Sequence, residues 1–307
     1  MNTILLTCSG GPAAVGVIKS LRDINFGGRV VSIDLDPLAV GGYMSDVSYV
    51  VPRSDSDEYW NVVLDIIKRE GVDLVLPTGD SDIRHFSQHR DLLESIGVSV
   101  FMSDYETIIT CQDKMKFYES CVSEFDTHLP KTTTNGYDLE LPILAKPRNG
   151  SGSRGIHLCK TFRELELIGN GDYIFQEYLP GQEYTVDVLC DMHNNVLSVV
   201  VRKRVQVKAG ISTKGEIVRD SYIEDLCTRI SKHLNIKGPV CIQLKNDING
   251  TPKFVEINPR LGGGTYFTTL SGVNFIDTIL KLNNGEDVSV PSPNEIKVVR
   301  YFEEIIV

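Results

Sequence analysis

The chain has 307 residues, a length that suits two domains, and its 41% hydrophobic and 23% charged residues are typical of a globular protein. Disordered, collagen-like and low-complexity chains are excluded by this composition. The formal net charge of −10 argues against nonspecific binding to nucleic acid or to an anionic membrane. A local basic pocket for a phosphorylated ligand is still compatible with that charge.

The seven cysteines are scattered, and no two of them form a Cys-x-x-Cys pair. This pattern favours buried thiols in a reducing compartment over disulfides or a zinc site. The apolar run Ile4-Leu5-Leu6 is too short for a signal segment, and no apolar run reaches the length of a membrane span. We therefore expect a cytoplasmic protein.

Short β-branched runs alternate with amphipathic stretches over about the first hundred residues. Five buried strands are predicted, at residues 3–8, 29–33, 47–51, 74–76 and 98–101. Helices are predicted after the break at Gly10-Gly11-Pro12 and over residues 59–70, where apolar side chains recur at helical spacing. Strands that alternate with helices predict a parallel, doubly wound sheet.

The pattern changes after residue 110, where strands come in neighbouring pairs. The predicted hairpins join residues 143–146 with 156–160, 184–189 with 196–202, and 240–245 with 253–257. A helix is predicted over residues 222–234. The sequence therefore predicts an α/β half followed by an α+β half, with a boundary near residues 105–112.

A weak glycine pattern follows the first predicted strand. Gly10, Gly11 and Gly16 have the spacing Gly-Gly-x4-Gly, and Asp34 ends the second strand. A dinucleotide-binding fingerprint has the spacing Gly-x-Gly-x-x-Gly instead. A tight strand-to-helix turn is the favoured interpretation, and binding of NAD is the minor alternative.

A second glycine-rich stretch is more informative. Residues 148–155 read Arg-Asn-Gly-Ser-Gly-Ser-Arg-Gly and directly follow Ala145-Lys146-Pro147. Glycines let backbone N–H groups approach phosphate oxygens closely, and Lys146 adds a positive charge beside them. A plain hairpin turn is the alternative, but such a turn requires none of these three basic residues.

Oxygen-bearing side chains gather on the last predicted hairpin. Strand alternation places Glu256 and Asn258 on one face, and Gln243 lies on the strand before. Mg²⁺ takes such oxygen ligands, usually with one or two carboxylates and substrate phosphates. Arg260 shares the alternation and is predicted to reach a phosphate. A solvated polar strand face is the alternative.

Two further segments are ambiguous on their own. Residues 176–181 leave a strand and turn at Pro-Gly, which exposes backbone groups able to read an adenine edge, and Glu183 follows at a spacing that suits ribose hydroxyls. A basic cluster, either an anion-binding patch or a solvated strand edge, consists of Arg202, Lys203, Arg204 and Lys208.

With these motifs in order, the chain resembles the ATP-grasp enzymes and is most similar to the carbamoyl-phosphate-synthetase-like branch of carboxylate–amine ligases. The resemblance implies a Rossmann-like domain over residues 1–110 and an ATP-grasp domain over residues 111–307. Within the second domain it implies a lid at about 115–178 and an antiparallel sheet that binds ATP and magnesium at about 179–307.

The resemblance also assigns roles to individual residues. The residues implied in ATP binding are Lys114, Lys146, Gly150, Ser151, Gly152, Ser153, Gly155, Glu177, Tyr178, Leu179, Glu183 and Gln243. Those implied as ligands of Mg²⁺, or alternatively Mn²⁺, are Gln243, Glu256 and Asn258. Arg260, Arg204 and Lys208 are the expected catalytic residues: Arg260 neutralises the triphosphate, and Arg202, Arg204 or Lys208 holds the carboxylate or the developing acyl phosphate. The glycine run at residues 262–264 is expected to let that intermediate approach the backbone closely. Gln243 departs from the family pattern, because many members carry Asp or Glu there.

The implied reaction activates a small-molecule carboxylate as an acyl phosphate and couples it to an amine, with release of ADP and phosphate. The expected partners are a carboxylate and an amine, with amino acids among the candidates, and a second copy of the chain in a homodimer. A non-catalytic nucleotide sensor or scaffold is the first alternative, and an NAD-dependent oxidoreductase is the second.

The sequence does not name the acid or the amine, because the residues of an acceptor pocket between domains have no fixed spacing. Asp80, Ser81 and Asp82 follow Pro77-Thr78-Gly79 at the end of a predicted strand. They are predicted either to contact substrate or to cap the following helix.

Overall fold

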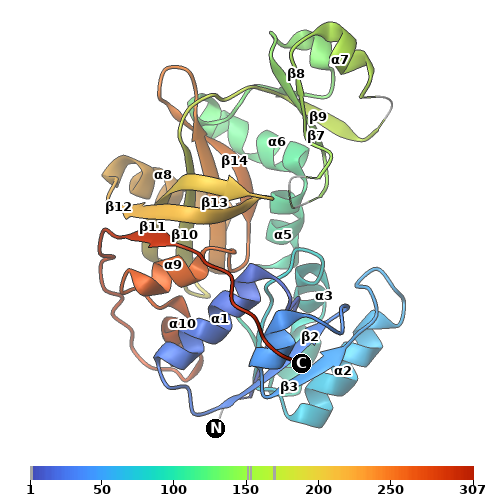
Figure 1. The fold of residues 1–307 in the computed structure, drawn as a ribbon, viewed down its shortest axis with the longest axis vertical. Coiled ribbons are helices and arrows are strands. Elements are labelled where there is room, and N and C mark those ends of the chain that lie inside the picture. Colours follow the sequence, from blue (N-terminus) through green and yellow to red (C-terminus); the bar gives the residue numbers. More distant parts are fainter. Residues whose placement is uncertain (1–2, 151, 153, 169–170) are drawn as a thin grey trace.

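The structure is a computed structural model, and it describes residues 3–150, 152, 154–168 and 171–307. Three sheets organise the chain, and Figure 1 shows them as three parts of an elongated molecule. Ser151 and Ser153 of the predicted phosphate loop lie outside the described residues.

The N-terminal sheet has five parallel strands, as predicted, and the structure orders them β3-β2-β1-β4-β5. Its strands are β1 (Thr3–Leu6), β2 (Arg29–Asp34), β3 (Val47–Val50), β4 (Leu74–Leu76) and β5 (Ser99–Val100). Its helices are α1 (Pro12–Asp23), η1 (Val40–Met44), α2 (Tyr59–Glu70), α3 (Ile83–Gln88), α4 (Arg90–Ser95) and α5 (Tyr105–Gln112). The first strand ends two residues earlier than predicted, because Cys8 takes a φ of 49° in the turn that follows.

Alternate residues of β1 pack into different cores. Ile4 and Leu6 belong to a core that α1 shares with β10, β11, α9 and α10, whereas Leu5 packs with Val31 and Ile66. Both faces of the parallel sheet are thus buried, as a doubly wound sheet requires. The first of these cores joins the N-terminal sheet to the rest of the chain.

The largest sheet is antiparallel, with six strands in the order β14-β13-β10-β11-β12-β15. Its strands are β10 (Glu183–Cys190), β11 (Val196–Lys208), β12 (Ile211–Val218), β13 (Gly238–Asn246), β14 (Pro252–Asn258) and β15 (Lys297–Val299). The helices packed around it are α6 (Lys114–Phe125), η2 (Asp126–His128), α8 (Ser221–His233), α9 (Thr265–Leu270) and α10 (Phe275–Asn283). Two of the predicted hairpins, β10–β11 and β13–β14, form the centre and one edge of this sheet.

A small four-stranded sheet, ordered β6-β9-β7-β8, stands apart at the top of Figure 1. Its strands are β6 (Thr132–Thr133), β7 (Ile143–Pro147), β8 (His157–Cys159) and β9 (Tyr173–Glu177). The same part of the chain contains the short helices η3 (Gly136–Asp138) and α7 (Phe162–Glu166). Its own core is small and includes Ile143, Ala145, Cys159 and Leu165. The helix α6, in contrast, buries Phe117 and other side chains in the core of the large sheet. The domain limits near residues 110 and 178 stay a prediction.

The fold class is the predicted one, a parallel α/β sheet followed by an α+β part that carries a small separate sheet. All seven cysteines are free thiols, and six of them are buried. Within the described ranges, no helix combines the length and the apolar character that crossing a bilayer requires.

Candidate active site

Two cavities meet at the glycine loop. The first, which we call the strand cavity, has a volume of about 240 Å³. It is lined by Lys114, Leu144, Lys146, Pro147, Gly150, Arg154, Ile156, Glu183, Arg204, Val207, Gly210, Gln243, Lys245, Val255 and Glu256. The second, the junction cavity, has a volume of about 280 Å³. It is lined by Asp80, Ser81, Arg84, Cys111, Gln112, Lys114, Gly150, Glu256 and Asn258.

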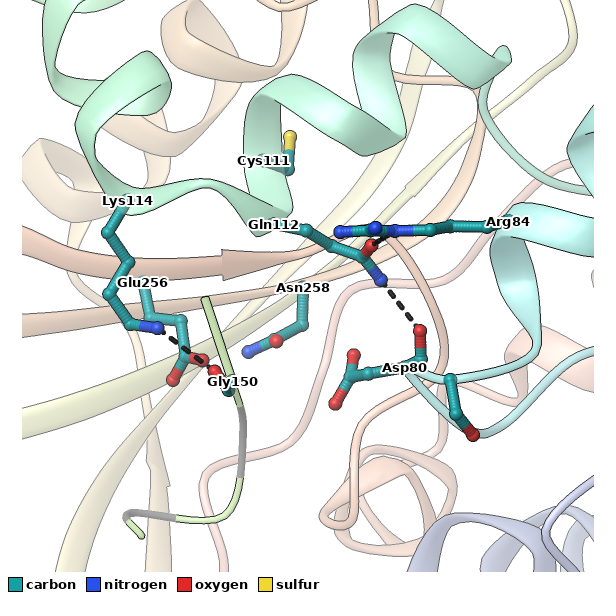
Figure 2. A pocket seen from close by; sticks show the side chains of 9 residues that line it. Asp80, Arg84, Cys111, Gln112, Lys114, Gly150, Glu256 and Asn258 are labelled. Atoms are coloured by element: carbon teal, nitrogen blue, oxygen red, sulfur yellow. Dashed lines mark hydrogen bonds between the residues drawn. The ribbon is translucent and has the colours of Figure 1, made fainter. Parts of the chain in front are cut away.

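Three residues line both cavities and therefore mark where the two meet: Lys114, Gly150 and Glu256. Figure 2 shows the junction cavity with these three on one side and with Asp80 and Arg84 on the other. A ligand that fills the strand cavity thus brings one of its ends to the wall of the junction cavity.

Lys146 is a buried cation on β7. Its side chain is 4% exposed, and the structure shows no ion pair for it among the described residues. Burial lowers the pKa of Lys146 to about 8, although Glu256 opposes this shift. A buried ammonium without an ion-pair partner is costly in the empty protein and becomes favourable when an anion enters. The strand cavity is therefore built to receive an anion.

Lys114 and Gly150 tie the glycine loop to helix α6. The Lys114 Nζ donates to the Gly150 carbonyl at 2.9 Å. Asp113 caps α6 through the Met115 and Lys116 N–H groups and forms an ion pair with Arg148 at 2.8 Å. Gly150 has a φ of 129°, a conformation that favours glycine, so the backbone explains this glycine directly. The loop is thus held beside Lys114 at the point where the cavities join.

The predicted metal ligands lie on one face of the β13–β14 hairpin. Gln243 is paired with Glu256 in the strand register, and Asn258 follows two residues later on the same face. Burial raises the pKa of Glu256, whereas the nearby Lys114 lowers it. Within the described residues, no cluster of three His, Cys, Asp or Glu side chains is placed to hold a metal ion.

This donor set still suits Mg²⁺ in one specific way. One carboxylate, Glu256, and two amide oxygens, from Gln243 and Asn258, match an ion that takes most of its remaining ligands from phosphates and water. The amide oxygen of Gln243 accepts only a long 3.5 Å hydrogen bond from Arg204, so it is weakly engaged by the protein. The residues therefore fit a magnesium ion that arrives with a nucleotide.

Arg204 and Glu183 form an ion pair in the strand cavity. The Arg204 guanidinium also donates to the Gly210 carbonyl at 2.7 Å and to the Ser212 hydroxyl at 3.2 Å. Arg204 was predicted to hold the substrate carboxylate or the developing acyl phosphate; it lines the strand cavity and not the junction cavity, and this role stays a prediction. In this structure Arg204 pairs with Glu183, the acid predicted to bind ribose.

Several predicted site residues line neither cavity among the described residues. They are Gly152, Gly155, Glu177, Tyr178, Leu179, Lys208 and Arg260. Lys208 is exposed at the end of β11; its neighbours Val207 and Gly210 line the strand cavity, but Lys208 itself does not, and its role stays a prediction. The Glu177 N–H donates to the Lys131 carbonyl at 3.0 Å. Pairing with adenine would therefore have to use other backbone groups of this segment. The roles of residues 177–179 stay a prediction.

Arg260 connects β14 to the N-terminal sheet. Its Nε and Nη2 atoms donate to the two carboxylate oxygens of Asp80, at 2.6 and 2.5 Å. Arg260 thus binds a carboxylate of the junction-cavity wall without lining the cavity itself, and its predicted contact with a phosphate stays a prediction. Asp82 precedes α3, but its carboxylate accepts from Cys8 and Ser81 and, within the described residues, caps no helix N–H. The capping alternative is therefore wrong for Asp82.

The glycine run at residues 262–264 was expected to let a reaction intermediate approach the backbone. The structure gives a different reason for Gly264. A Cβ atom there would lie 2.1 Å from Nη2 of Arg202, a guanidinium that is 2% exposed and paired with Asp187. Gly262 faces Cys241 and Asp187 in the same way. These two glycines make room for buried protein groups, and Arg202 is therefore not available to a substrate.

A Gly264→Ala substitution should lower the free energy of unfolding by about 2 kcal/mol or more, because the methyl group overlaps a buried guanidinium. Gly27→Ala is the matched control, since a Cβ there has no heavy atom within 4 Å, and we expect no loss of stability. Urea unfolding followed by tryptophan fluorescence measures both. Equal stabilities for the two variants would contradict the packing role of Gly264.

Besides Cys111, sequence reasoning missed two polar residues of the junction cavity, Arg84 and Gln112. Arg84 lies on α3, whose buried residues are Ile83, Phe86 and Ser87, and Gln112 ends α5. Neither belongs to a spaced motif. The sequence feature that pointed to the Arg84 side of the cavity was the polar run containing Asp80 and Ser81. Both residues line the cavity, as expected if they contact substrate.

Comparisons with known proteins cover both parts of the chain. A family model described as "ATP-grasp in the biosynthetic pathway with Ter operon" matches residues 170–305. A second, described as "PylC-like, N-terminal domain", matches residues 4–101. The D-aspartate ligase of Enterococcus faecium is 25% identical over 78% of this chain and 67% of its own length. The chain spans 66% and 67% of two curated relatives, and only 25% and 29% of two others.

Solved structures give the same fold. The N5-carboxyaminoimidazole synthetase of Staphylococcus aureus, complexed with ADP, has a TM-score of 0.77 and 16% identity, over 98% of this chain and 82% of that chain. The biotin carboxylase domain dimer of the 2-oxoglutarate carboxylase of Hydrogenobacter thermophilus, in complex with MgADP, ADP and bicarbonate, has a TM-score of 0.73 and 18% identity, over 93% and 70%. These matches show an ATP-grasp domain over residues 170–305 and a PylC-like N-terminal domain over residues 4–101, and the solved structures share the fold.

Proposed function

We propose that the protein is an ATP-dependent carboxylate–amine ligase. The observation that carries the proposal is the adjacency of the two cavities through Lys114, Gly150 and Glu256. The triphosphate of ATP occupies the strand cavity beside Lys146, and the carboxylate that it activates occupies the junction cavity. The complexes of relatives with ADP and with MgADP support this assignment of the strand cavity.

The first step takes place where the two cavities meet. An oxygen of the substrate carboxylate forms a bond to the γ-phosphorus, the bond from that phosphorus to the β-phosphate oxygen breaks, and ADP leaves. An amine nitrogen then attacks the acyl carbon, the bond from carbon to the phosphate oxygen breaks, and the amine loses a proton to solvent or to the departing phosphate. A carboxylate alone is a poor electrophile, and this phosphorylation gives it a leaving group.

The protein contributes position and charge to this chemistry. Lys146 and Lys114 neutralise phosphate oxygens, and the glycine loop excludes water, which otherwise hydrolyses the acyl phosphate. Gln243, Glu256 and Asn258 would hold Mg²⁺, which neutralises phosphate charge when it is bound. This division of labour requires no protein nucleophile.

An isotope experiment tests the proposed reaction. A pool of small carboxylic acids labelled with ¹⁸O in the carboxylate is incubated with ATP, magnesium and a pool of amines. Attack of the carboxylate on the γ-phosphorus transfers one ¹⁸O atom to the inorganic phosphate. Unlabelled phosphate with ADP formation that does not depend on the acid would contradict the ligase proposal and favour a simple nucleotide-binding protein.

The alternative of NAD binding receives no support from the N-terminal loop. Both carboxylate oxygens of Asp34 are used within the protein, by the N–H groups of Gly10 at 2.8 Å and Asp36 at 3.0 Å. The carboxylate that would bind ribose hydroxyls thus closes the turn itself. This agrees with the interpretation of Gly10 and Gly11 as a tight strand-to-helix turn.

Lys146 makes nucleotide binding depend on pH. Its pKa is about 8 in the empty protein, and bound phosphates raise that pKa. Below pH 8 the ammonium is already charged, whereas above pH 8 binding must take up a proton. The affinity for Mg-ATP should therefore fall about tenfold per pH unit above pH 8. Calorimetry between pH 7.5 and 9.5 measures this, and a constant affinity would contradict it.

We further propose that the chain forms a homodimer, acts in the cytoplasm and can use Mn²⁺ in place of Mg²⁺. A relative is described as a domain dimer. For this chain the homodimer stays a prediction, and amino acids are the substrates suggested by the likeness to D-aspartate ligase.

A further inference from the structure

Arg84 is a cation on the wall of the junction cavity without an acidic partner. Within the part of the chain that the structure describes, no carboxylate forms an ion pair with it. Its Nε donates to the Oε1 atom of Gln112, and the structure gives its two Nη atoms no hydrogen-bond acceptor among the described residues. The two Nη atoms of a guanidinium form a fork that matches the two oxygens of a carboxylate.

Gln112 holds this guanidinium in place. Its Nε2 donates to the Asp80 carbonyl at 2.7 Å, which turns its Oε1 towards Arg84. Figure 2 shows the chain of contacts from Arg84 through Gln112 to Asp80 along one side of the cavity. A side chain that is already fixed on one edge loses less conformational freedom when it binds a ligand. Arg84 is therefore preorganised.

Asp80, a carboxylate of the same cavity wall, does not neutralise Arg84. Asp80 lies on the same side of the cavity, but both of its carboxylate oxygens are bound by Arg260. The opposite side carries Lys114, Gly150 and Glu256, which also line the strand cavity. The junction cavity therefore has two ends. At the end next to Lys114 and Glu256 the acid is activated by the phosphate, and at the other end the guanidinium of Arg84 can bind a second anion.

We propose that the acid activated by this protein is a small dicarboxylate, and this inference rests on the proposed ligase function. One carboxylate lies at the Glu256 end and forms the bond to the γ-phosphorus as ADP leaves, while the other stays ionised and binds the two Nη atoms of Arg84. A single cavity of about 280 Å³ contains both ends, so the molecule that reaches one end also meets the other. This volume suits a small diacid.

The test uses diacids and their monoamides, which differ by one charge and almost nothing in shape. The pairs are succinate and succinamate, aspartate and asparagine, and glutamate and glutamine, with both enantiomers of each amino acid. Hydroxylamine serves as the amine, because its nitrogen attacks an acyl phosphate and expels phosphate to leave a hydroxamate. The readouts are hydroxamate formation and, separately, the dissociation constant of Mg-ATP.

We expect at least one diacid to exceed its monoamide by about 30-fold in kcat/KM, since a bidentate charged contact is lost in the monoamide. Arg84→Gln should remove this difference and leave the dissociation constant of Mg-ATP unchanged, whereas Arg84→Lys should keep part of it. Arg163→Gln, an exposed arginine on α7 outside both cavities, is the matched control and should keep the full preference.

Five results would overturn the dicarboxylate proposal. Three concern the wild type: equal use of diacids and monoamides, preference for 2-carboxyethylphosphonate (a phosphonate in place of the second carboxylate) over every diacid, or binding of Mg-ATP without turnover of any diacid. Two concern Arg84→Gln: a diacid preference that survives the substitution, or an effect on the KM of the amine alone. Failure of the wild type to bind Mg-ATP at all would instead refute the proposed ligase function.

Discussion

Replacing Glu256 with Gln should reduce acid-dependent ADP release by about a thousandfold without unfolding the protein. Glu256 is the only carboxylate among the three candidate magnesium ligands, and it lines both cavities. The substitution keeps the shape of the side chain and removes its charge. Because burial raises the pKa of Glu256, the empty protein should lose no stability when that charge is removed.

Glu216→Gln is the matched control for this variant. Glu216 lies on β12 of the same sheet, outside both cavities, and its contact with Lys297 is long at 3.7 Å. Its ADP release and melting temperature should both equal those of the wild type. Wild-type ADP release in Glu256→Gln would contradict the metal assignment, and a melting temperature far below that of Glu216→Gln would show that Glu256 is structural instead.

Replacing Lys146 with Met should have opposite effects on the empty and the nucleotide-bound protein. A pKa of about 8, where an exposed lysine has 10.5, corresponds to a penalty of roughly 3 kcal/mol for the charged form at neutral pH. Met fills a similar volume without this penalty. The melting temperature without nucleotide should therefore rise, whereas the stabilisation by Mg-ATP should disappear.

Lys245→Met provides the comparison for Lys146. Lys245 lines the same cavity, but it is partly exposed and its Nζ lies 5.4 Å from the centre of the Tyr178 ring. We expect little change in the melting temperature of the empty protein and retention of most of the Mg-ATP stabilisation. Thermal denaturation with and without Mg-ATP measures both variants. A Lys146→Met protein that melts lower than wild type and still responds to Mg-ATP would refute the role assigned to Lys146.

The predictable part of the site is the part that depends on local rules. Glu256 and Asn258 share a face because strand side chains alternate, and the hairpin places Gln243 opposite Glu256. Lys146 beside a glycine loop predicted an anion site, because a cation and exposed backbone N–H groups are what phosphate oxygens bind. The parallel sheet likewise follows from strands that alternate with helices.

The rest of the site depends on contacts between segments that are distant in the sequence. Arg260 binds Asp80 across 180 residues, and Arg84 binds Gln112 from another helix. Arg204 and Lys208 lie on one strand, but the sheet buries the first beside Glu183 and leaves the second exposed. No spacing rule specifies such contacts, because they depend on how the N-terminal sheet packs against β14.

Gly262 and Gly264 are required by the packing of buried side chains in the folded protein. In the sequence they resembled a second loop for close approach of a ligand. In the structure a Cβ at Gly264 would overlap Arg202, so the requirement comes from a buried ion pair. Glycine is thus required at position 150 by the backbone conformation and at position 264 by side-chain packing.

Calorimetric titration of Mg-ATP into the full chain tests the central claim most directly, because every assigned role depends on a triphosphate in the strand cavity. We predict one saturable site per chain, weaker binding when magnesium is chelated, and loss of the heat in Lys146→Met. A wild-type titration without heat of binding at millimolar magnesium, or one in which Lys146→Met binds like the wild type, would contradict the account.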